Sequence, residues 1–199
     1  MPLVTIEGLD GAGKTTLAAG LAQALPDAVL LREPGGVQAS ERVRALVKDP
    51  SLRIGARAEA LLYAAARAQL VEERVRPALD RGELVLLDRF VDSSLAYQGA
   101  GRGLGVEAVA AINEFGTGGL RPDLTLLLRI DPVAGRARQA GRGESPDRLE
   151  LAEDAFFERI ATAYDELAAA EPERFRILDA RRAPDDLVAE ALRAIGELP

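Results

Sequence analysis

The sequence predicts an α/β fold, a three-layer α/β/α sandwich around a parallel sheet of about five strands. Short apolar runs bounded by turn residues are typical of strands buried on both faces, and longer helical patterns separate them, as expected for right-handed crossovers. The apolar runs cover residues 3–6, 28–31, 84–87, 124–130 and 175–178. The helical patterns cover about 15–25, 38–47, 56–80, 106–115, 132–140, 151–170 and 184–197. Because ligands of such sheets bind beyond the carboxyl ends of the strands, functional residues are expected in the segments after each strand.

Composition limits the chemistry available to the chain. Its 199 residues suit a single domain, 1–199, and 48% of them are hydrophobic. The sequence has no histidine and no cysteine, which excludes histidine bases, cysteine nucleophiles, disulfides and thiolate or imidazole metal sites. The net charge of −7 does not favour a nucleic-acid partner. No apolar run approaches the ~20 residues of a membrane helix and no signal peptide is recognised, so a cytoplasmic protein is expected.

A phosphate-binding loop follows the first predicted strand. Residues 8–15 satisfy the pattern G-x-x-x-x-G-K-[ST] at every fixed position. The glycines allow successive backbone amides to point at a phosphate, the lysine reaches the β- and γ-phosphates, and the threonine offers a hydroxyl to Mg²⁺. The pattern therefore predicts a P-loop NTPase fold. The residues expected to bind ATP here are Gly8, Leu9, Asp10, Gly11, Ala12, Gly13, Lys14, Thr15 and Thr16.

An aspartate and an arginine follow the third predicted strand. The run 84–87 leads into Asp88, as in a Walker B element whose carboxylate holds Mg²⁺ directly or through water. The alternative is a strand-terminal aspartate that caps the next helix. Arg89 follows, and its guanidinium suits a second phosphate. The only lysines are Lys14 and Lys48, so the Asn-Lys-x-Asp segment of GTPases is absent. A small, arginine-rich P-loop protein fits a kinase of a small phosphorylated acceptor.

Further segments together resemble the thymidylate kinase family over nearly the whole chain. They are Glu7–Thr16, Arg32–Gly36, Tyr63–Arg67, Asp88–Phe90, Ser94–Gly99, Gly101–Gly103, Arg121–Thr125 and Arg142–Glu144. The resemblance implies a nucleoside monophosphate kinase that uses ATP and Mg²⁺ to convert dTMP into dTDP, a step of dTTP synthesis. It also implies a homodimer formed through helices such as 56–80.

The resemblance implies roles for residues around the acceptor's phosphate and sugar. Asp10 would bind the 3′-hydroxyl or help Thr15 and Asp88 to hold Mg²⁺, while Arg44 and Arg89 would contact the acceptor phosphate. An aromatic ring at Tyr97 would pack against the sugar. For Arg44, a solvated helix face is the competing interpretation.

The resemblance places the thymine between two predicted helices. Tyr63 would stack on the base, although the family usually has phenylalanine there, and Arg67, four residues later on the same helix face, would donate to a base carbonyl. Ser94 and Gln98 would hydrogen-bond the pyrimidine. Without the resemblance, Tyr63 and Arg67 would favour a core aromatic beside a surface arginine. Ser94 and Gln98 fit a polar helix face equally well.

After the second predicted strand, Glu33 and Pro34 are expected to shape the acceptor pocket. The resemblance implies a cis peptide bond before Pro34. Arg32 and Glu33 could equally form a structural ion pair.

The segment from about 141 to 151 is expected to be a lid, because Gly141, Gly143 and Pro146 are typical of a loop that can move. The family takes a catalytic arginine from the phosphate loop or from the lid, and Gly11 occupies the loop position, so the resemblance implies the bacterial type. A flexible basic surface loop is the alternative. The residues expected to act in catalysis are Lys14, Asp10, Arg89, Arg142 and Arg148. The resemblance also places Arg182 near the adenine.

Two other functions stay open at this level. Another nucleoside monophosphate kinase would share the phosphate loop and differ in its acceptor. A nucleotide-dependent switch protein would hydrolyse ATP slowly without an acceptor, and the acceptor-side residues Arg67, Arg89 and Tyr97 argue against it.

Overall fold

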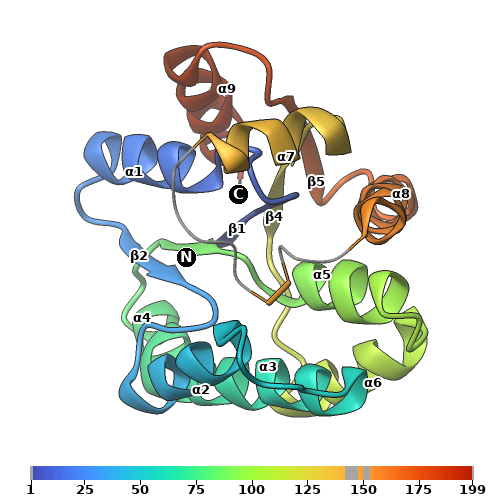
Figure 1. Cartoon of the computed structure of the whole chain (residues 1–199). Helices are drawn as coiled ribbons and strands as arrows, with labels where there is room; N and C mark the ends of the chain where they lie inside the picture. Colours follow the sequence, from blue (N-terminus) through green and yellow to red (C-terminus); the bar gives the residue numbers. More distant parts are fainter. Residues whose placement is uncertain (1, 142–147, 150–152, 199) are drawn as a thin grey trace.

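The computed structural model describes residues 2–141, 148–149 and 153–198. Its centre is a five-stranded sheet in the order β2-β3-β1-β4-β5, with every neighbouring pair parallel (Figure 1). The strands are β1 (Leu3–Gly8), β2 (Val29–Arg32), β3 (Val85–Asp88), β4 (Leu124–Arg129) and β5 (Phe175–Asp179). The predicted α/β class and the five strand positions are confirmed.

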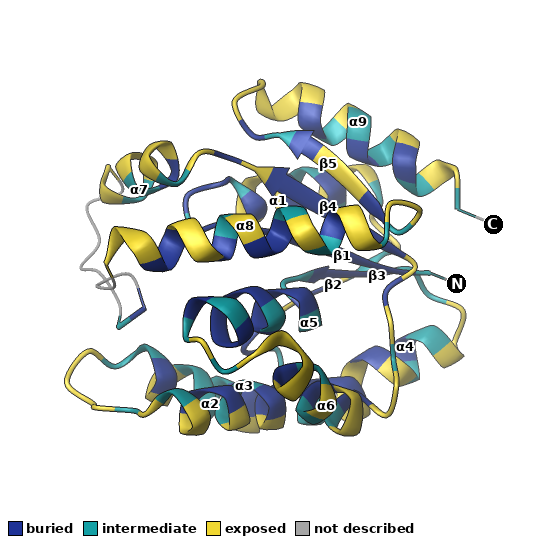
Figure 2. Cartoon of the chain, turned by 90° about the vertical axis from the view of Figure 1, so that its right-hand side faces the viewer, coloured by how far each residue is buried: buried dark blue, intermediate teal, exposed yellow. Residues whose placement is uncertain are grey.

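Helices cover both faces of the sheet. On one face, α1 packs against α9, and on the other lie α8 and the helices around α5 (Figures 1 and 2). The helices of the first half are α1 (Lys14–Ala24), α2 (Gln38–Lys48), α3 (Ala56–Leu70), η1 (Val71–Val75), α4 (Arg76–Asp80), α5 (Val91–Ser94) and η2 (Leu95–Gly101). Those of the second half are α6 (Val106–Thr117), α7 (Pro132–Ala140), α8 (Asp154–Ala170) and α9 (Pro184–Gly196). Among the described residues, no helix is long and apolar enough to cross a membrane.

Two helical stretches depart from regular α-helix. The predicted helix 56–80 is continuous, but its backbone has π-helical hydrogen bonding over Val71–Val75. A second π-helical stretch, Leu95–Gly101, continues the short helix after β3. Such insertions are frequent at functional sites because they change the direction of side chains. Here the second stretch carries Tyr97 and Gln98.

Burial explains why β1 lies at the centre. All six residues of β1 are buried, which is typical of a parallel strand covered by helices on both faces. The edge strands β2 and β5 are less covered, and they expose Leu30 and Ile177. One apolar core joins the sheet to α1, α8 and α9, and the other joins it to α3, η1 and α4.

The strand order determines which loops meet. In the sheet, Asp88 at the end of β3 pairs with Ile6 of β1 and with Arg32 of β2. The segments that follow these three strands therefore lie together at the carboxyl edge of the sheet. They are the phosphate loop, the Glu33–Pro34 turn and Arg89.

Candidate active site

The phosphate loop requires glycine where the backbone is left-handed or crowded. Gly8, Gly11 and Gly13 have φ angles of +136°, +79° and +100°. A Cβ atom would lie 2.4 Å from the Leu128 carbonyl oxygen at Gly8, and 2.0 Å from the Gly135 carbonyl oxygen at Gly11. Helix α1 begins directly after the loop, so its first free N–H groups point toward an anion bound there.

Lys14 is a buried cation in this loop. Its side chain is nearly covered, and Nζ donates to the carbonyl oxygens of Gly8 at 3.0 Å and Leu9 at 2.8 Å. Burial and the nearby Arg89 guanidinium lower the pKa of Lys14 to about 8, although Asp10 and Asp88 oppose the shift. A polyphosphate would supply the negative charge that favours the ammonium form.

Thr15 and Asp88 form an oxygen pair that suits Mg²⁺. Thr15 Oγ1 donates to Asp88 Oδ2 at 3.5 Å, while Asp88 Oδ1 is fully buried and no residue in the described part of the chain donates to it. Magnesium prefers oxygen ligands and commonly takes only one or two from the protein, with the others from phosphates and water. The described residues contain no cluster of three or more acidic, histidine or cysteine side chains that could hold a metal by themselves.

Asp10, Arg89 and Tyr97 form a connected group beside the loop. Arg89 Nη2 donates to Asp10 Oδ1, and the Tyr97 hydroxyl donates to Asp10 Oδ2 at 2.8 Å. Burial opposes ionisation of Asp10, but Arg89, Lys14 and the Tyr97 hydroxyl together hold its pKa at about 2. The Arg89 guanidinium also lies 4.9 Å from the centre of the Tyr97 ring. Both Asp10 oxygens thus have protein partners in this structure.

The backbone of Arg89 is unusual and is held by a buried carboxylate. Its φ is +69°, in the left-handed region that non-glycine residues rarely adopt. Glu7 Oε1 accepts from the next backbone amide, Phe90 N, at 2.7 Å, and Glu7 Oε2 accepts from Ser93 Oγ at 2.6 Å. Ser93 Oγ in turn accepts from Arg89 Nη1 at 3.0 Å. Burial raises the pKa of Glu7, and nearby Asp92 adds to the effect.

Arg67 is buried and its guanidinium group is hydrogen-bonded throughout, so the competing interpretation of a surface arginine is wrong. Nε donates to Glu33 Oε2 at 2.7 Å, and Nη2 donates to the Phe90 carbonyl oxygen at 2.8 Å. Nη1 donates to Ser94 Oγ at 2.9 Å and to Asn113 Oδ1. The alternative pair between Arg32 and Glu33 is wrong, because Arg32 pairs with Glu41 at 2.8 Å.

Glu33 and Pro34 follow β2 at the wall of the same site. The Glu33–Pro34 peptide bond is cis, as the family resemblance implied. Burial raises the pKa of Glu33 to about 7 against the opposing charge of Arg67. Glu33 Oε1 is fully buried and has no hydrogen-bond partner among the described residues. Arg44 Nη1 donates to the Pro34 carbonyl oxygen at 3.0 Å, which ties α2 to this turn.

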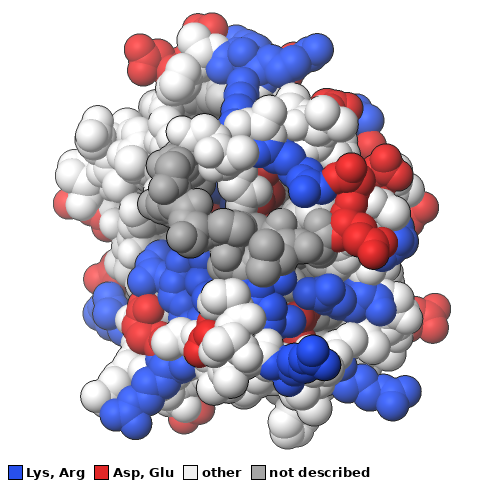
Figure 3. Space-filling model, in the orientation of Figure 1, with Lys and Arg blue, Asp and Glu red and all other residues white. Residues whose placement is uncertain are grey.

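These residues line one cavity of about 330 Å³, which we call the acceptor cavity. It brings together residues from the phosphate loop, β2–α2, α3, β3 and α5–η2, and Lys and Arg side chains gather across this face of the molecule (Figure 3). Its lining comprises Asp10, Gly11, Gly13, Lys14, Thr15, Arg32, Glu33, Pro34, Arg44, Lys48, Tyr63, Arg67, Asp88, Arg89, Ser93, Ser94, Tyr97, Gln98, Gln139 and Leu149. All the residues predicted for the acceptor therefore lie around one space, as do the residues predicted for the metal.

Three predicted residues lie elsewhere or are not described. Arg142 is outside the described residues. Arg148 donates from Nη2 to Glu59 Oε2 at 2.5 Å and from Nε to the Val47 carbonyl oxygen at 3.0 Å. Arg182, which lies just before α9, pairs with Glu190 in the middle of that helix. The roles of these three arginines stay predictions.

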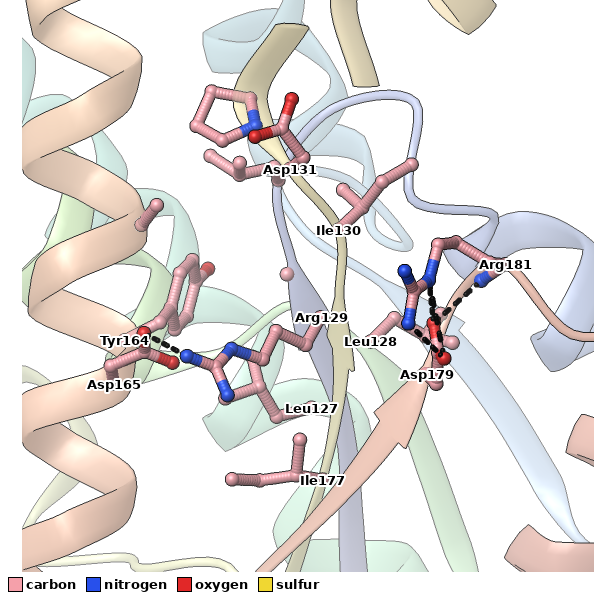
Figure 4. Close-up of a pocket in the computed structure, with 14 residues that line it drawn as sticks. Leu127, Leu128, Arg129, Ile130, Asp131, Tyr164, Asp165, Ile177, Asp179 and Arg181 are labelled. Carbon is pink, nitrogen blue, oxygen red and sulfur yellow. Dashed lines mark hydrogen bonds and ion pairs between the residues drawn. The ribbon is translucent and has the colours of Figure 1, made fainter. Parts of the chain in front are cut away.

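A second cavity, of about 570 Å³, lies between α8, β4 and β5 (Figure 4). Arg129 pairs with Asp165 across it at 2.7 Å, and Arg181 pairs with Asp179 at 2.8 Å on its other side. Its floor is largely apolar, with Leu127 and Ile177 (Figure 4). The sequence did not predict this cavity, because it arises where α8 leaves part of the edge strand uncovered.

Comparisons with known proteins agree with this geometry. The family model for thymidylate kinase matches residues 6–191. The thymidylate kinase of Deinococcus radiodurans is 52% identical over 198 residues, which cover 98% of this chain and 96% of that protein. That of Halorhodospira halophila is 48% identical over 197 residues, covering 96% and 91%. The crystal structure of thymidylate kinase from Ehrlichia chaffeensis superposes with a TM-score of 0.81 at 26% identity and covers 98% of both chains.

The chain belongs to the thymidylate kinase family. As a thymidylate kinase it transfers a phosphoryl group from ATP to dTMP and produces dTDP. The fold and the reaction that the sequence predicted are confirmed.

Three buried residues that the sequence did not predict hold the site residues in position through hydrogen bonds. Glu7, Ser93 and Asn113 hold Arg89, Phe90 and Arg67 through the bonds described above. A glutamate within the apolar first strand is a signal that could have identified Glu7, since a buried charge requires partners.

Proposed function

We propose that dTMP binds in the acceptor cavity with its phosphate toward Arg89 and its base toward Tyr63, Ser94 and Gln98. The observation that carries the proposal is that one cavity joins the phosphate loop to this set of side chains. The volume of about 330 Å³ is at the lower end of the range for small-molecule sites. The whole chain would act as one kinase domain.

The donor would bind along the phosphate loop. Loop amides and Lys14 would contact the β- and γ-phosphates of ATP, and Thr15 and Asp88 would hold Mg²⁺. When bound, Mg²⁺ would neutralise part of the phosphate charge. Asp10 would accept a hydrogen bond from the acceptor's 3′-hydroxyl or help Thr15 and Asp88 to hold Mg²⁺. Arg182 is assigned to the adenine because it lies in the loop after β5, at the same edge of the sheet.

The acceptor phosphate would be fixed by two arginines. Arg89 reaches the cavity from β3 and Arg44 reaches it from α2. Charge-assisted hydrogen bonds from guanidinium groups orient a phosphate well, and correct orientation supplies much of the rate in phosphoryl transfer. The attacking phosphate oxygen is already ionised, so the reaction needs no histidine base.

The lid arginines would complete the charge stabilisation. Arg142 and Arg148 are assigned to this role, in which they would stabilise the equatorial oxygens of the transferred group. For Arg148 the role requires its pair with Glu59 to open.

Two matched substitutions test whether dTMP binds in the acceptor cavity and not in the second cavity. Arg89→Met should lower kcat/KM for dTMP by about 10³-fold, because charged hydrogen bonds to the phosphate are lost, while the Kd for ADP changes little. The matched control is Arg129→Met, the same change at an arginine of the second cavity, which should stay within about threefold of wild type. A large loss in the control with normal activity for Arg89→Met would refute the assignment.

A homodimer is proposed as the assembled form. Phe115 on α6 is 92% exposed and Leu61 on α3 is 54% exposed, and α3 and α6 pack against each other. Large apolar side chains with this exposure on adjoining helices favour burial against a second copy of the chain.

A further inference from the structure

Glu59 is a fully buried carboxylate on α3 that accepts hydrogen bonds from four donor atoms of described residues. Its Oε1 accepts from Gln98 Nε2 at 2.9 Å and from Arg102 Nε at 3.2 Å. Its Oε2 accepts from Arg102 Nη2 at 3.2 Å and from Arg148 Nη2 at 2.5 Å. Glu59 does not line the acceptor cavity, whereas its partner Gln98 does.

The Glu59 contact determines which way the Gln98 amide points. A carboxylate paired with two guanidinium groups accepts hydrogen bonds and does not donate them, so the amide must present Nε2 to it. Gln98 Oε1 then lies on the opposite side of the amide. No described residue donates to Gln98 Oε1. This oxygen is also absent from the fully buried, unpartnered side-chain oxygens of the described residues, which are Glu33 Oε1 and Asp88 Oδ1, so it is accessible from the cavity. Gln98 Oε1 therefore keeps its acceptor capacity for whatever occupies the cavity.

We propose that Glu59 is a specificity-determining positioning residue. By holding Gln98 Nε2, it keeps Gln98 Oε1 available as an acceptor, so the site selects pyrimidines that carry a hydrogen on N3. Thymine and uracil have that hydrogen, whereas cytosine has a lone pair at N3. That lone pair would face Gln98 Oε1, and the two acceptors would repel each other. This inference rests on the proposed placement of the base beside Gln98.

Arg102 holds the Glu59 carboxylate in place, and Arg148 adds a second contact while its pair with Glu59 stays closed. Arg102 is itself fixed, since its guanidinium lies 4.6 Å from the centre of the Phe156 ring. Arg148 connects the same carboxylate to the Val47 carbonyl oxygen at the end of α2. Breaking the hydrogen bond from Gln98 to the buried Glu59 carboxylate is unfavourable, because each lost bond would leave part of a buried charge unsatisfied.

The test compares dUMP with dCMP, which differ only at N3 and the group on C4. In Glu59→Gln the new amide can donate as well as accept, so Gln98 can turn over. The ratio of kcat/KM for dUMP to that for dCMP should fall by about tenfold or more, since a mismatched buried hydrogen bond is what excludes cytosine. A purely structural role would lower both values together and leave the ratio unchanged, and that result would overturn the inference.

Two further variants separate this inference from the proposed base site. Gln98→Leu should also reduce the ratio, and Glu59→Gln added to it should change the ratio by less than about twofold. If Gln98→Leu alters neither substrate, the base does not bind there and the proposed site fails. If Gln98→Leu alters the ratio and Glu59→Gln does not, only the role of Glu59 fails. Glu171→Gln, the same change at a carboxylate that pairs with Arg121 and Arg174 and does not line the acceptor cavity, is the control and should keep the ratio within about twofold.

A measurement on the wild-type protein tests the Gln98–Glu59 contact directly. In the ¹⁵N-labelled chain, the Nε2 protons of Gln98, assigned by their absence in Gln98→Leu, should be protected from solvent exchange with and without dUMP. Rapid exchange in the free protein would show that Glu59 does not hold the amide and would overturn the inference.

Discussion

Lys14→Met should abolish phosphoryl transfer without destabilising the free protein at neutral pH. An ordinary substitution in a buried position lowers the free energy of unfolding by about 1–3 kcal/mol. Lys14 differs because its ammonium is buried before any phosphate is bound. Methionine has a similar length and is apolar, so it removes the buried charge and still fills the space.

The magnitude follows from the pKa of Lys14. The folded protein lowers it from the usual 10.5 to about 8. At about 1.4 kcal/mol per pH unit, the charged form costs the folded state on the order of 3 kcal/mol at pH 7. The variant loses two hydrogen bonds, to the carbonyl oxygens of Gly8 and Leu9, which together are worth about 2 kcal/mol. The free energy of unfolding of Lys14→Met is therefore expected to exceed that of the wild type by about 1 kcal/mol at pH 7.

The effect has a defined pH dependence. Between pH 8 and 10.5 the unfolded chain holds a proton on Lys14 that the folded protein has released, so wild-type stability rises through this window. The variant lacks this contribution, so its advantage at pH 7 should disappear by about pH 10. Urea unfolding followed by circular dichroism, at pH 7 and pH 10, measures both values. The matched control is Lys48→Met, at the only other lysine in the sequence, which should change stability by no more than about 0.5 kcal/mol at pH 7.

Two outcomes would refute this reasoning. One is a loss of more than about 2 kcal/mol in Lys14→Met at pH 7, which would show that the ammonium stabilises the free protein. The other is a stability difference from wild type that does not change with pH.

Three other predictions concern the metal, Asp10 and the assembly. Asp88→Asn should raise the Mg²⁺ concentration for half-maximal activity by about tenfold or more, and an unchanged Mg²⁺ titration would contradict the metal assignment. The pKa of Asp10 is lowered to about 2, so its ionised form contributes about 2 kcal/mol above pH 4 that is lost as the pH falls toward 2. The stability difference between wild type and Asp10→Asn should therefore shrink over that range in acid titrations followed by fluorescence, and a constant difference would argue against the Arg89 pairing. Phe115→Asp should give a folded monomer by light scattering, because Phe115 makes little contact within its own chain, and a wild-type monomer would contradict the dimer.

The parts of the site that local pattern alone predicted are contiguous or follow directly from the strand order, whereas the acceptor-side residues came from the family resemblance. The glycines, Lys14 and Thr15 occupy one short segment whose backbone dictates its chemistry. Asp88 was predictable because it ends an apolar strand, and in a parallel sheet such ends meet at one edge. Local pattern and topology were sufficient for these residues.

Burial and partner choice were beyond the sequence. Arg67 looked like a surface arginine as readily as a site residue, since its partners Glu33, Phe90 and Asn113 come from three distant segments. Glu59 carried no signal, because a glutamate on an alanine-rich helix usually faces solvent. The π-helical stretch at Leu95–Gly101 has no recognised sequence pattern, yet it orients Tyr97 and Gln98.

The account is tested most directly by a crystal structure of the protein with dTMP, ADP and Mg²⁺. It predicts dTMP in the acceptor cavity, with its phosphate bound by Arg89 and its pyrimidine N3 hydrogen-bonded to Gln98 Oε1. It also predicts Mg²⁺ beside Thr15 and Asp88. Nucleoside monophosphate in the second cavity, beside Arg129 and Asp165, with the acceptor cavity holding only water, would contradict it.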